Sequence, residues 1–137
     1  MGMRILSATA LTGILMGCVA APPIPQISQE MRDRIAANRP HCAEARQCEA
    51  MWAATRDWVV KNCEMKIQTI ADSFIETYNS VANKLYCRVW KDPSPGGGYD
   101  FHAEFNCNYG CVINPDAPPA LLLENAVNAA AAQFAQH

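Results

Sequence analysis

The sequence predicts an α+β two-layer sandwich, in which a helix, an antiparallel sheet of three or four strands and a C-terminal helix follow one another. Three observations support this prediction. Apolar residues recur every three or four positions over residues 44–62, they alternate with polar residues over 85–91 and 99–107, and they form a second helical stripe over 120–136. Helices that bury such stripes against one face of a sheet form this class of domain. The other face of the sheet then stays uncovered.

The helix expected over residues 44–62 has one broad apolar stripe and an opposite charged side. The stripe includes Trp52 and Trp58, and aromatic side chains of this size dominate small cores. We therefore expect both to pack in the core rather than to form a ligand platform. A shorter polar helix is expected ahead of it, over residues 28–37, with Ser28 as its N-cap and only a loose attachment.

Strand-forming residues follow the long helix. Residues 66–70 and 74–78 are rich in β-branched and aromatic side chains, and the three residues between them have turn chemistry. Two short strands in a tight hairpin are the preferred interpretation, and one long bent strand is the alternative. A Pro- and Gly-rich link at 92–98 then joins strands 85–91 and 99–107, which form the clearest hairpin of the chain.

Alternation assigns the two faces of this second hairpin. The inward side receives Leu85, Cys87, Val89, Phe101, Ala103, Phe105 and Cys107. The opposite side receives Tyr86, Asp100, Asn106 and a candidate binding face made of Arg88, Trp90, His102 and Glu104. Aromatic and arginine side chains are enriched at interface hot spots, so we expect this face to bind a partner. A merely solvated face is the alternative.

A second long helix is expected at the C-terminal end. It follows a Pro-rich stretch at 115–119 and extends from about residue 120 towards 136, with prolines in its first turn. Leu123, Val127 and Phe134 lie on its narrow apolar stripe. The many alanines favour a helix and allow close approach to neighbouring elements.

The chain begins with the features of a signal peptide. Residues 1–4 are cationic, and the apolar run 5–15 has eleven residues, fewer than the roughly 20 that a membrane span requires. A short apolar run between a cationic start and a small residue is typical of a cleaved signal. Residues 1–17 are therefore expected to be removed as a lipoprotein signal peptide.

Leu15-Met16-Gly17-Cys18 resembles the lipobox of bacterial lipoproteins. The resemblance implies that the chain is cut before Cys18, that this cysteine is acylated on its sulfur and its amine, and that the lipid anchors the protein in a membrane. Val19 at the next position implies the outer membrane, with the protein facing the periplasm. An ordinary secretory signal is the alternative.

Residues 18–40 are interpreted as the lipidated cysteine and a Pro-rich tether, and residues 41–137 as a single periplasmic domain. Removal of Arg4 with the signal lowers the formal net charge from −2 to −3. This balance argues against nucleic-acid binding, which depends on clustered Lys and Arg. The expected partners are the membrane, through the lipid, and an envelope protein or peptidoglycan.

Six cysteines follow the lipobox, and an even number in an oxidising envelope favours disulfides. They are Cys42, Cys48, Cys63, Cys87, Cys107 and Cys111. With four strands, which we favour, the last four gather at the C-terminal end of the first long helix. With three strands, Cys107 would instead reach Cys48. A bridge from Cys42 to Cys48 requires a non-helical approach, because six helical residues rise about 9 Å and bridged Cα atoms lie within about 7 Å.

Metal binding or thiol redox chemistry in the periplasm is the alternative function. His41, Cys42, Cys48, Cys107 and Cys111 are the soft ligands that would suit copper or zinc. Structural zinc sites usually contain two closely spaced cysteine pairs, whereas this chain has one such pair. Cys107 and Cys111 also lack the C-x-x-C spacing of redox motifs. We therefore predict no metal and no other cofactor.

No pattern of catalytic residues is recognisable. The chain has no G-x-S-x-G motif, and its three histidines have no evident nucleophile beside them. His102-Ala103-Glu104 has the H-x-E spacing of zinc deaminases, but the cysteines that follow lack the P-C-x-x-C pattern. The sequence therefore predicts a non-catalytic protein.

Several strings between residues 47 and 112 resemble a group of small uncharacterised proteobacterial lipoproteins. The strings are Cys48-x-x-Met51-Trp52, Trp58-Val59, Lys66-Ile67-Gln68-Thr69, Ile75-Glu76-Thr77-Tyr78 and Cys107-Asn108-Tyr109-Gly110-Cys111. Cys42, Cys63 and Cys87 are additions to that pattern, so no disulfide pairing transfers from the group. The resemblance implies a location and a fold, and it implies no activity.

Overall fold

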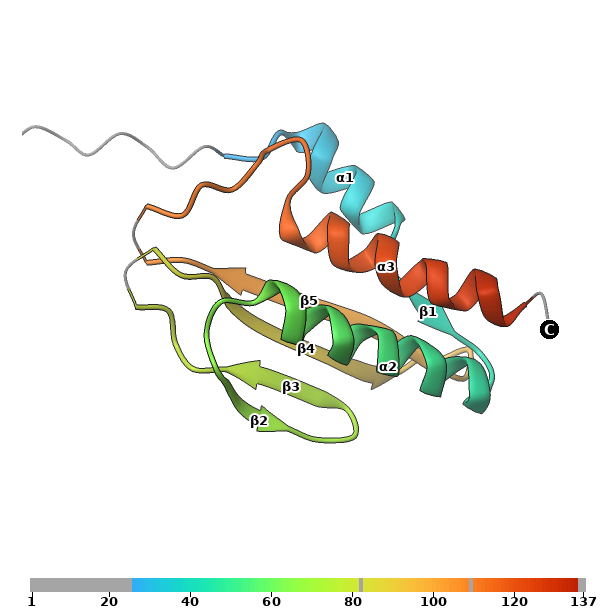
Figure 1. Ribbon diagram of the computed structural model, residues 1–137. Helices are drawn as coiled ribbons and strands as arrows, with labels where there is room; N and C mark the ends of the chain where they lie inside the picture. Colours follow the sequence, from blue (N-terminus) through green and yellow to red (C-terminus); the bar gives the residue numbers. More distant parts are fainter. Residues whose placement is uncertain (1–25, 82, 109, 136–137) are drawn as a thin grey trace, which may run out of the picture.

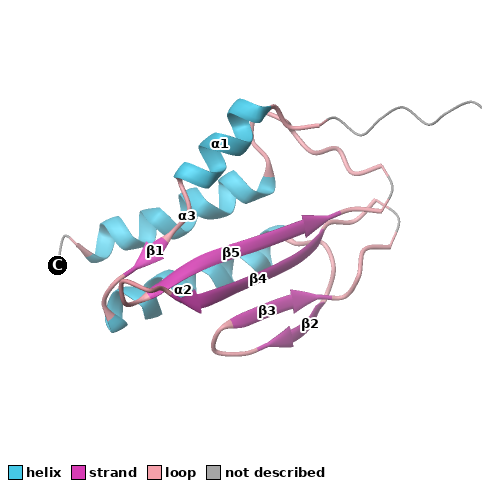
Figure 2. Ribbon diagram, turned by 180° about the vertical axis from the view of Figure 1, so that it is seen from behind, coloured by secondary structure: helices cyan, strands magenta, loops and turns pink. Residues whose placement is uncertain are grey.

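The computed structural model describes residues 26–81, 83–108 and 110–135, which form an antiparallel sheet with helices on one side (Figure 1). The elements are α1 Gln29–Ala37, β1 His41–Cys42, α2 Ala45–Asn62, β2 Ile67–Ile70, β3 Phe74–Thr77, β4 Tyr86–Pro93, β5 Tyr99–Asn106 and α3 Pro119–Phe134. The helix α2 lies across one face of the sheet, and α3 packs beside it (Figure 1). In Figure 2 the sheet lies in front of α2, and no described helix covers this second face.

The α+β class is confirmed, but the sheet has five strands, in the order β1-β5-β4-β3-β2, rather than three or four. Both predicted hairpins are present, as β2–β3 and β4–β5, so the single bent strand is not formed. The additional strand is β1, whose His41 and Cys42 pair with the start of β5. A strand of two residues has no alternation to recognise, and sequence patterns therefore miss it.

Gly98 makes the contact between β1 and β5 possible. Its φ is +73°, and a Cβ atom placed on it would overlap the carbonyl oxygen of Cys42. Only glycine both adopts this conformation readily and leaves the space that the carbonyl occupies. The link at 92–98 therefore does more than separate two strands, because its Gly98 also allows β1 to pack beside β5.

The core forms where the stripe of α2 meets the inner face of the sheet. The ring centroids of Trp52 and Phe101 are 6.2 Å apart, and those of Trp58 and Phe105 are 5.7 Å apart. Both tryptophans thus pack against the sheet, as predicted. The buried cluster consists of Cys42, Cys48, Met51, Trp52, Val59, Ile75, Val89, Phe101, Leu123 and Val127.

Three disulfides join the six cysteines that follow Cys18. They pair Cys42 with Cys48, Cys63 with Cys87, and Cys107 with Cys111. The second and third agree with the four-strand arrangement, and the Cys48–Cys107 bridge expected for three strands is not formed. The first closes over a Cα–Cα distance of 5.1 Å because α2 begins only at Ala45 and the residues before it are not helical.

Ser28 caps α1 as predicted, because its hydroxyl accepts the Met31 N–H at 3.1 Å. No residue of α1 is buried, but its C-cap residue Asn38 contacts α3. The Asn38 amide donates to Asn125 Oδ1 at 3.0 Å, and the Asn128 amide donates to the Asn38 carbonyl at 2.8 Å. The segment interpreted as a tether therefore contains a helix that is hydrogen-bonded to α3.

The predicted signal peptide and the lipidation site Cys18 lie outside the described residues. Among the helices that are described, none is both long and apolar enough to cross a membrane.

Candidate binding face

Two cross-strand rows of side chains run over the sheet face that no described helix covers. The aromatic row is Phe74–Trp90–His102, and the charged row is Glu76–Arg88–Glu104. Both rows belong to β3, β4 and β5. We call the surface made of these six residues together with Asp92 and Asp100 the uncovered face.

The aromatic row is held in a fixed orientation. The rings of Trp90 and His102 stack at a centroid distance of 5.4 Å and an interplanar angle of 15°. The indole N–H of Trp90 donates to Asp92 Oδ2 at 2.9 Å, and His102 Nε2 lies 3.7 Å from the same oxygen. Asp92 therefore anchors the indole ring against which His102 stacks, and Trp90 presents an aromatic surface without a free polar atom on its ring.

Glu76 is the centre of the charged row. Its Oε1 accepts the Tyr86 hydroxyl at 2.7 Å and the Nε and Nη2 of Arg88 at 3.1 and 2.8 Å. The hydrogen bond from Tyr86, followed by that from Arg88, holds the pKa of Glu76 below its ordinary value. Burial, together with the Glu76 carboxylate, raises the pKa of Tyr86 to about 12. At neutral pH Glu76 is therefore an anion and Tyr86 a permanent donor.

The uncovered face is acidic. Its four carboxylates face one guanidinium, so its formal charge is −3 when His102 is neutral. Arg88 Nη1 lies 3.5 Å from Glu104 Oε2, and Asp100 Oδ1 lies 2.9 Å from His41 Nδ1. Hydrogen bonds from His41 and then Ser94 lower the pKa of Asp100, which keeps this carboxyl ionised as well. A positively charged surface is the electrostatic complement of this face.

A shallow hollow of about 330 Å³ lies on the uncovered face beside Trp90. Phe74 and Trp90 give it an apolar floor, and Arg88 and Asp92 give it charged groups. An apolar centre with charged groups around it is the arrangement of many protein interfaces. The lining residues are Ser73, Phe74, Arg88, Trp90, Lys91 and Asp92.

The structure brings together the four residues that sequence alternation assigned to the candidate binding face: Arg88, Trp90, His102 and Glu104. Sequence reasoning missed Phe74, Glu76 and Asp92 as further members of this face. A signal existed for all three, because Asp92 continues the alternation of β4, and Phe74 and Glu76 alternate with buried residues of β3. What was not available from the sequence was the register that sets Glu76 opposite Arg88.

The alternative metal ligands are engaged in other bonds. Cys42 is bonded to Cys48 and Cys107 to Cys111, so thiolate coordination would require reduction of both disulfides. His41 contacts Asp100 through Nδ1. Over residues 26–81, 83–108 and 110–135, no three His, Cys, Asp or Glu side chains form a group that could hold a metal ion.

No protein-family model matches this chain, and no curated protein or solved structure matches it either. The resemblance of residues 47–112 to small proteobacterial lipoproteins therefore stays a prediction. The described residues define a disulfide-bonded α+β domain with one uncovered, acidic sheet face.

Proposed function

We propose that this chain is a non-catalytic, lipid-anchored protein of the bacterial envelope that binds another envelope protein through its uncovered face. The observation that carries the proposal is the stacked pair Trp90–His102, set beside a charged row whose groups hold one another in place. Side chains that are already ordered lose little conformational entropy when a partner binds. The uncovered face is thus preorganised for binding.

Three disulfides support the extracytoplasmic part of this proposal. Disulfides form and persist in oxidising compartments, among them the bacterial periplasm. Together with the lipobox resemblance, they support an anchor at Cys18 that holds the domain at the outer membrane, facing the periplasm.

The charge of the uncovered face defines the partner's chemistry. A formal charge of −3 over three strands favours a protein surface that presents Lys or Arg. The Trp90 ring adds an apolar and cation–π contact for the same side chains. We therefore propose a basic protein segment as the ligand of this face.

The anchor is tested by mass spectrometry of the N-terminal peptide. We expect the mature chain to begin at Cys18 with acyl groups on its sulfur and amine, and to partition with membranes. Cys18→Ser should give an uncleaved or soluble form. An unmodified N-terminus near Val19 would refute the lipoprotein assignment.

The binding face is tested by crosslinking in intact cells with two matched double variants. Trp90→Ala with Glu104→Lys changes the uncovered face, and Val60→Ala with Asp57→Lys makes the same kind of change on the exposed side of α2. We expect the first variant to lose a protein adduct that the second retains, while both keep the three disulfides.

Two results would refute this binding proposal. One is an adduct that survives the change at Trp90 and Glu104. The other is cosedimentation with purified peptidoglycan that these substitutions abolish without any protein adduct, which would identify peptidoglycan as the ligand.

A further inference from the structure

Two loops lie together at one end of the molecule (Figures 1 and 2). We call their described residues, 78–81, 83–85, 107–108 and 110–118, the loop end. Asn108 ties one loop to the other, because its backbone N–H donates to Ser80 Oγ at 3.3 Å and its amide donates to the Ser80 carbonyl at 2.6 Å. The Ser80 hydroxyl donates in turn to the Lys84 carbonyl. The Cys107–Cys111 disulfide closes the second loop. The two loops therefore form one connected unit.

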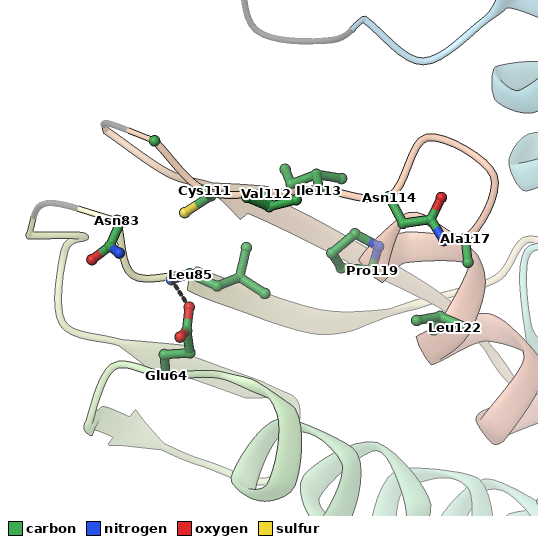
Figure 3. Close-up of a pocket in the computed structure, with 11 residues that line it drawn as sticks. Glu64, Asn83, Leu85, Cys111, Val112, Ile113, Asn114, Ala117, Pro119 and Leu122 are labelled. Atoms are coloured by element: carbon green, nitrogen blue, oxygen red, sulfur yellow. Dashed lines mark hydrogen bonds between the residues drawn. The ribbon is translucent and has the colours of Figure 1, made fainter.

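This connected unit exposes apolar side chains. Val112 is 99% exposed, Val81 is 61% exposed, and Leu122 at the start of α3 is 45% exposed. A hollow of about 470 Å³ is lined by Val112 and Leu122 but not by Val81, and Figure 3 shows Leu85, Ile113 and several of its other lining residues. Exposed apolar groups that gather at one place mark an interaction site more often than scattered ones do.

The loop end has few charges. Residues 78–85 and 107–118 contain one cation, Lys84, and one anion, Asp116. The nearby carboxylate of Glu64 accepts the backbone N–H of Leu85 at 2.8 Å (Figure 3). Four exposed asparagines, at positions 79, 83, 108 and 114, make this surface polar but nearly uncharged. Such a surface suits the boundary of a bilayer better than a charged protein partner.

The proposed lipid at Cys18 indicates that the medium beside the loop end is the membrane. The described part of the chain begins at Gln26. The segment that leads into α1 lies on the same side of the molecule as the loop end (Figures 1 and 2). Eight residue steps separate Gln26 from Cys18, and they span at most about 29 Å. A lipid at Cys18 therefore keeps the loop end within reach of the bilayer surface.

We propose that the loop end contacts the membrane, with Val81 and Val112 inserted at the boundary of the acyl chains. This inference rests on the proposed lipid anchor. A valine side chain that is fully removed from water contributes roughly tenfold to partitioning, so two valines fix an orientation that a single point of attachment does not. Because β4 begins and β5 ends at the loop end, the strands of the uncovered face then run away from the membrane and leave that face accessible to a partner.

The test places a photoreactive diazirine amino acid at Val112, at Val81 or at Ile70 in the full chain. Ile70 is 55% exposed and lies at the β2–β3 turn, at the other end of β3 from the loop end, so it is a matched control. Each protein is anchored in vesicles of phosphatidylethanolamine and phosphatidylglycerol and irradiated. Mass spectrometry then measures phospholipid adducts and, separately, the acylation of Cys18.

We expect lipid adducts at Val112 and Val81 at least tenfold above those at Ile70. An acylated protein whose three probes capture lipid equally would overturn this proposal and leave the anchor intact. A chain without acylation at Cys18 would overturn both. A probe at Val112 that captures protein but no lipid in intact cells would assign the loop end to a protein interface instead and overturn membrane contact.

Discussion

The two faces of β4 are held in place in different ways. Cys87 and Val89 point to the helices and are 0% and 1% exposed, whereas Arg88 and Trp90 point away from them and are only half-buried. The covered side gains stability by removing apolar surface from water. The uncovered side removes less, since Tyr86 is its one buried side chain on this strand, and its other groups are ordered by hydrogen bonds and stacking. Changes on the two sides should therefore have separable effects, one on folding and one on binding.

Two carboxyl groups illustrate the same difference. Glu76 on the uncovered face accepts three hydrogen bonds, and its pKa is lowered. Glu124 on α3 is buried among apolar groups, its Oε2 has no hydrogen-bond partner in the structure, and burial raises its pKa to about 7, against the opposing effects of Arg39 and Asn38. Partners, rather than burial alone, decide the sign of the shift.

The largest predicted loss of folding stability comes from a substitution on the covered side of the sheet. Phe101→Ala should lower the free energy of unfolding by about 3–5 kcal/mol, because it opens a cavity beside Trp52. Trp90→Ala, the matched aromatic truncation on the uncovered face, should cost less than about half as much. Urea denaturation measures both, and equal losses would contradict the proposed division between the faces.

The next effect concerns the disulfide that fastens α2 to β4. Replacing Cys63 and Cys87 by Ala should cost about 3.5 kcal/mol, because the bridge closes a loop of 24 residue steps. Replacing Cys107 and Cys111, four steps apart, should cost about 2 kcal/mol. Thermal unfolding of the two double variants tests the order, and a larger loss for the second pair would show that the loop end matters more to folding than chain entropy indicates.

Glu124 is expected to make the free energy of unfolding depend on pH, by up to about 3 kcal/mol. Its pKa is raised in the folded state, so the folded protein binds the proton more tightly than the unfolded chain. The free energy of unfolding should therefore fall as pH rises from about 4.5 to about 7, and then level off. Glu124→Gln should remove this fall, and Glu49→Gln on the exposed side of α2 should not. An unchanged pH profile in Glu124→Gln would contradict the assignment.

The smallest effect on folding is expected at Glu104, whose side chain is 54% exposed. Glu104→Gln should change the free energy of unfolding by less than about 0.5 kcal/mol. It should nevertheless weaken partner binding and reduce its dependence on salt, since one of the complementary charges is lost. The yield of crosslinking, measured at increasing salt concentration, tests this difference, and Asp57→Gln is the control.

Alternation was enough to predict the hairpins, the inward Val89 and Phe101, and the outward set around Trp90, because these depend on neighbours along one strand. The short strand β1 was not predictable, since Cys42 is held there by the approach of Gly98, which is far away in sequence. The partner of Arg88 and the environment of Glu124 also depend on register and helix packing. Local patterns carry no information about such long-range contacts.

The most direct test of the central claim compares photocrosslinking from two exposed positions in intact cells. One probe replaces Glu104 on the uncovered face, and the other replaces Asp57 on the opposite side of the domain, on α2. We predict one discrete protein adduct from position 104, which weakens when Trp90 is also changed to Ala, and no matching adduct from position 57. The same adduct from both positions, or from position 57 alone, would contradict binding through the uncovered face.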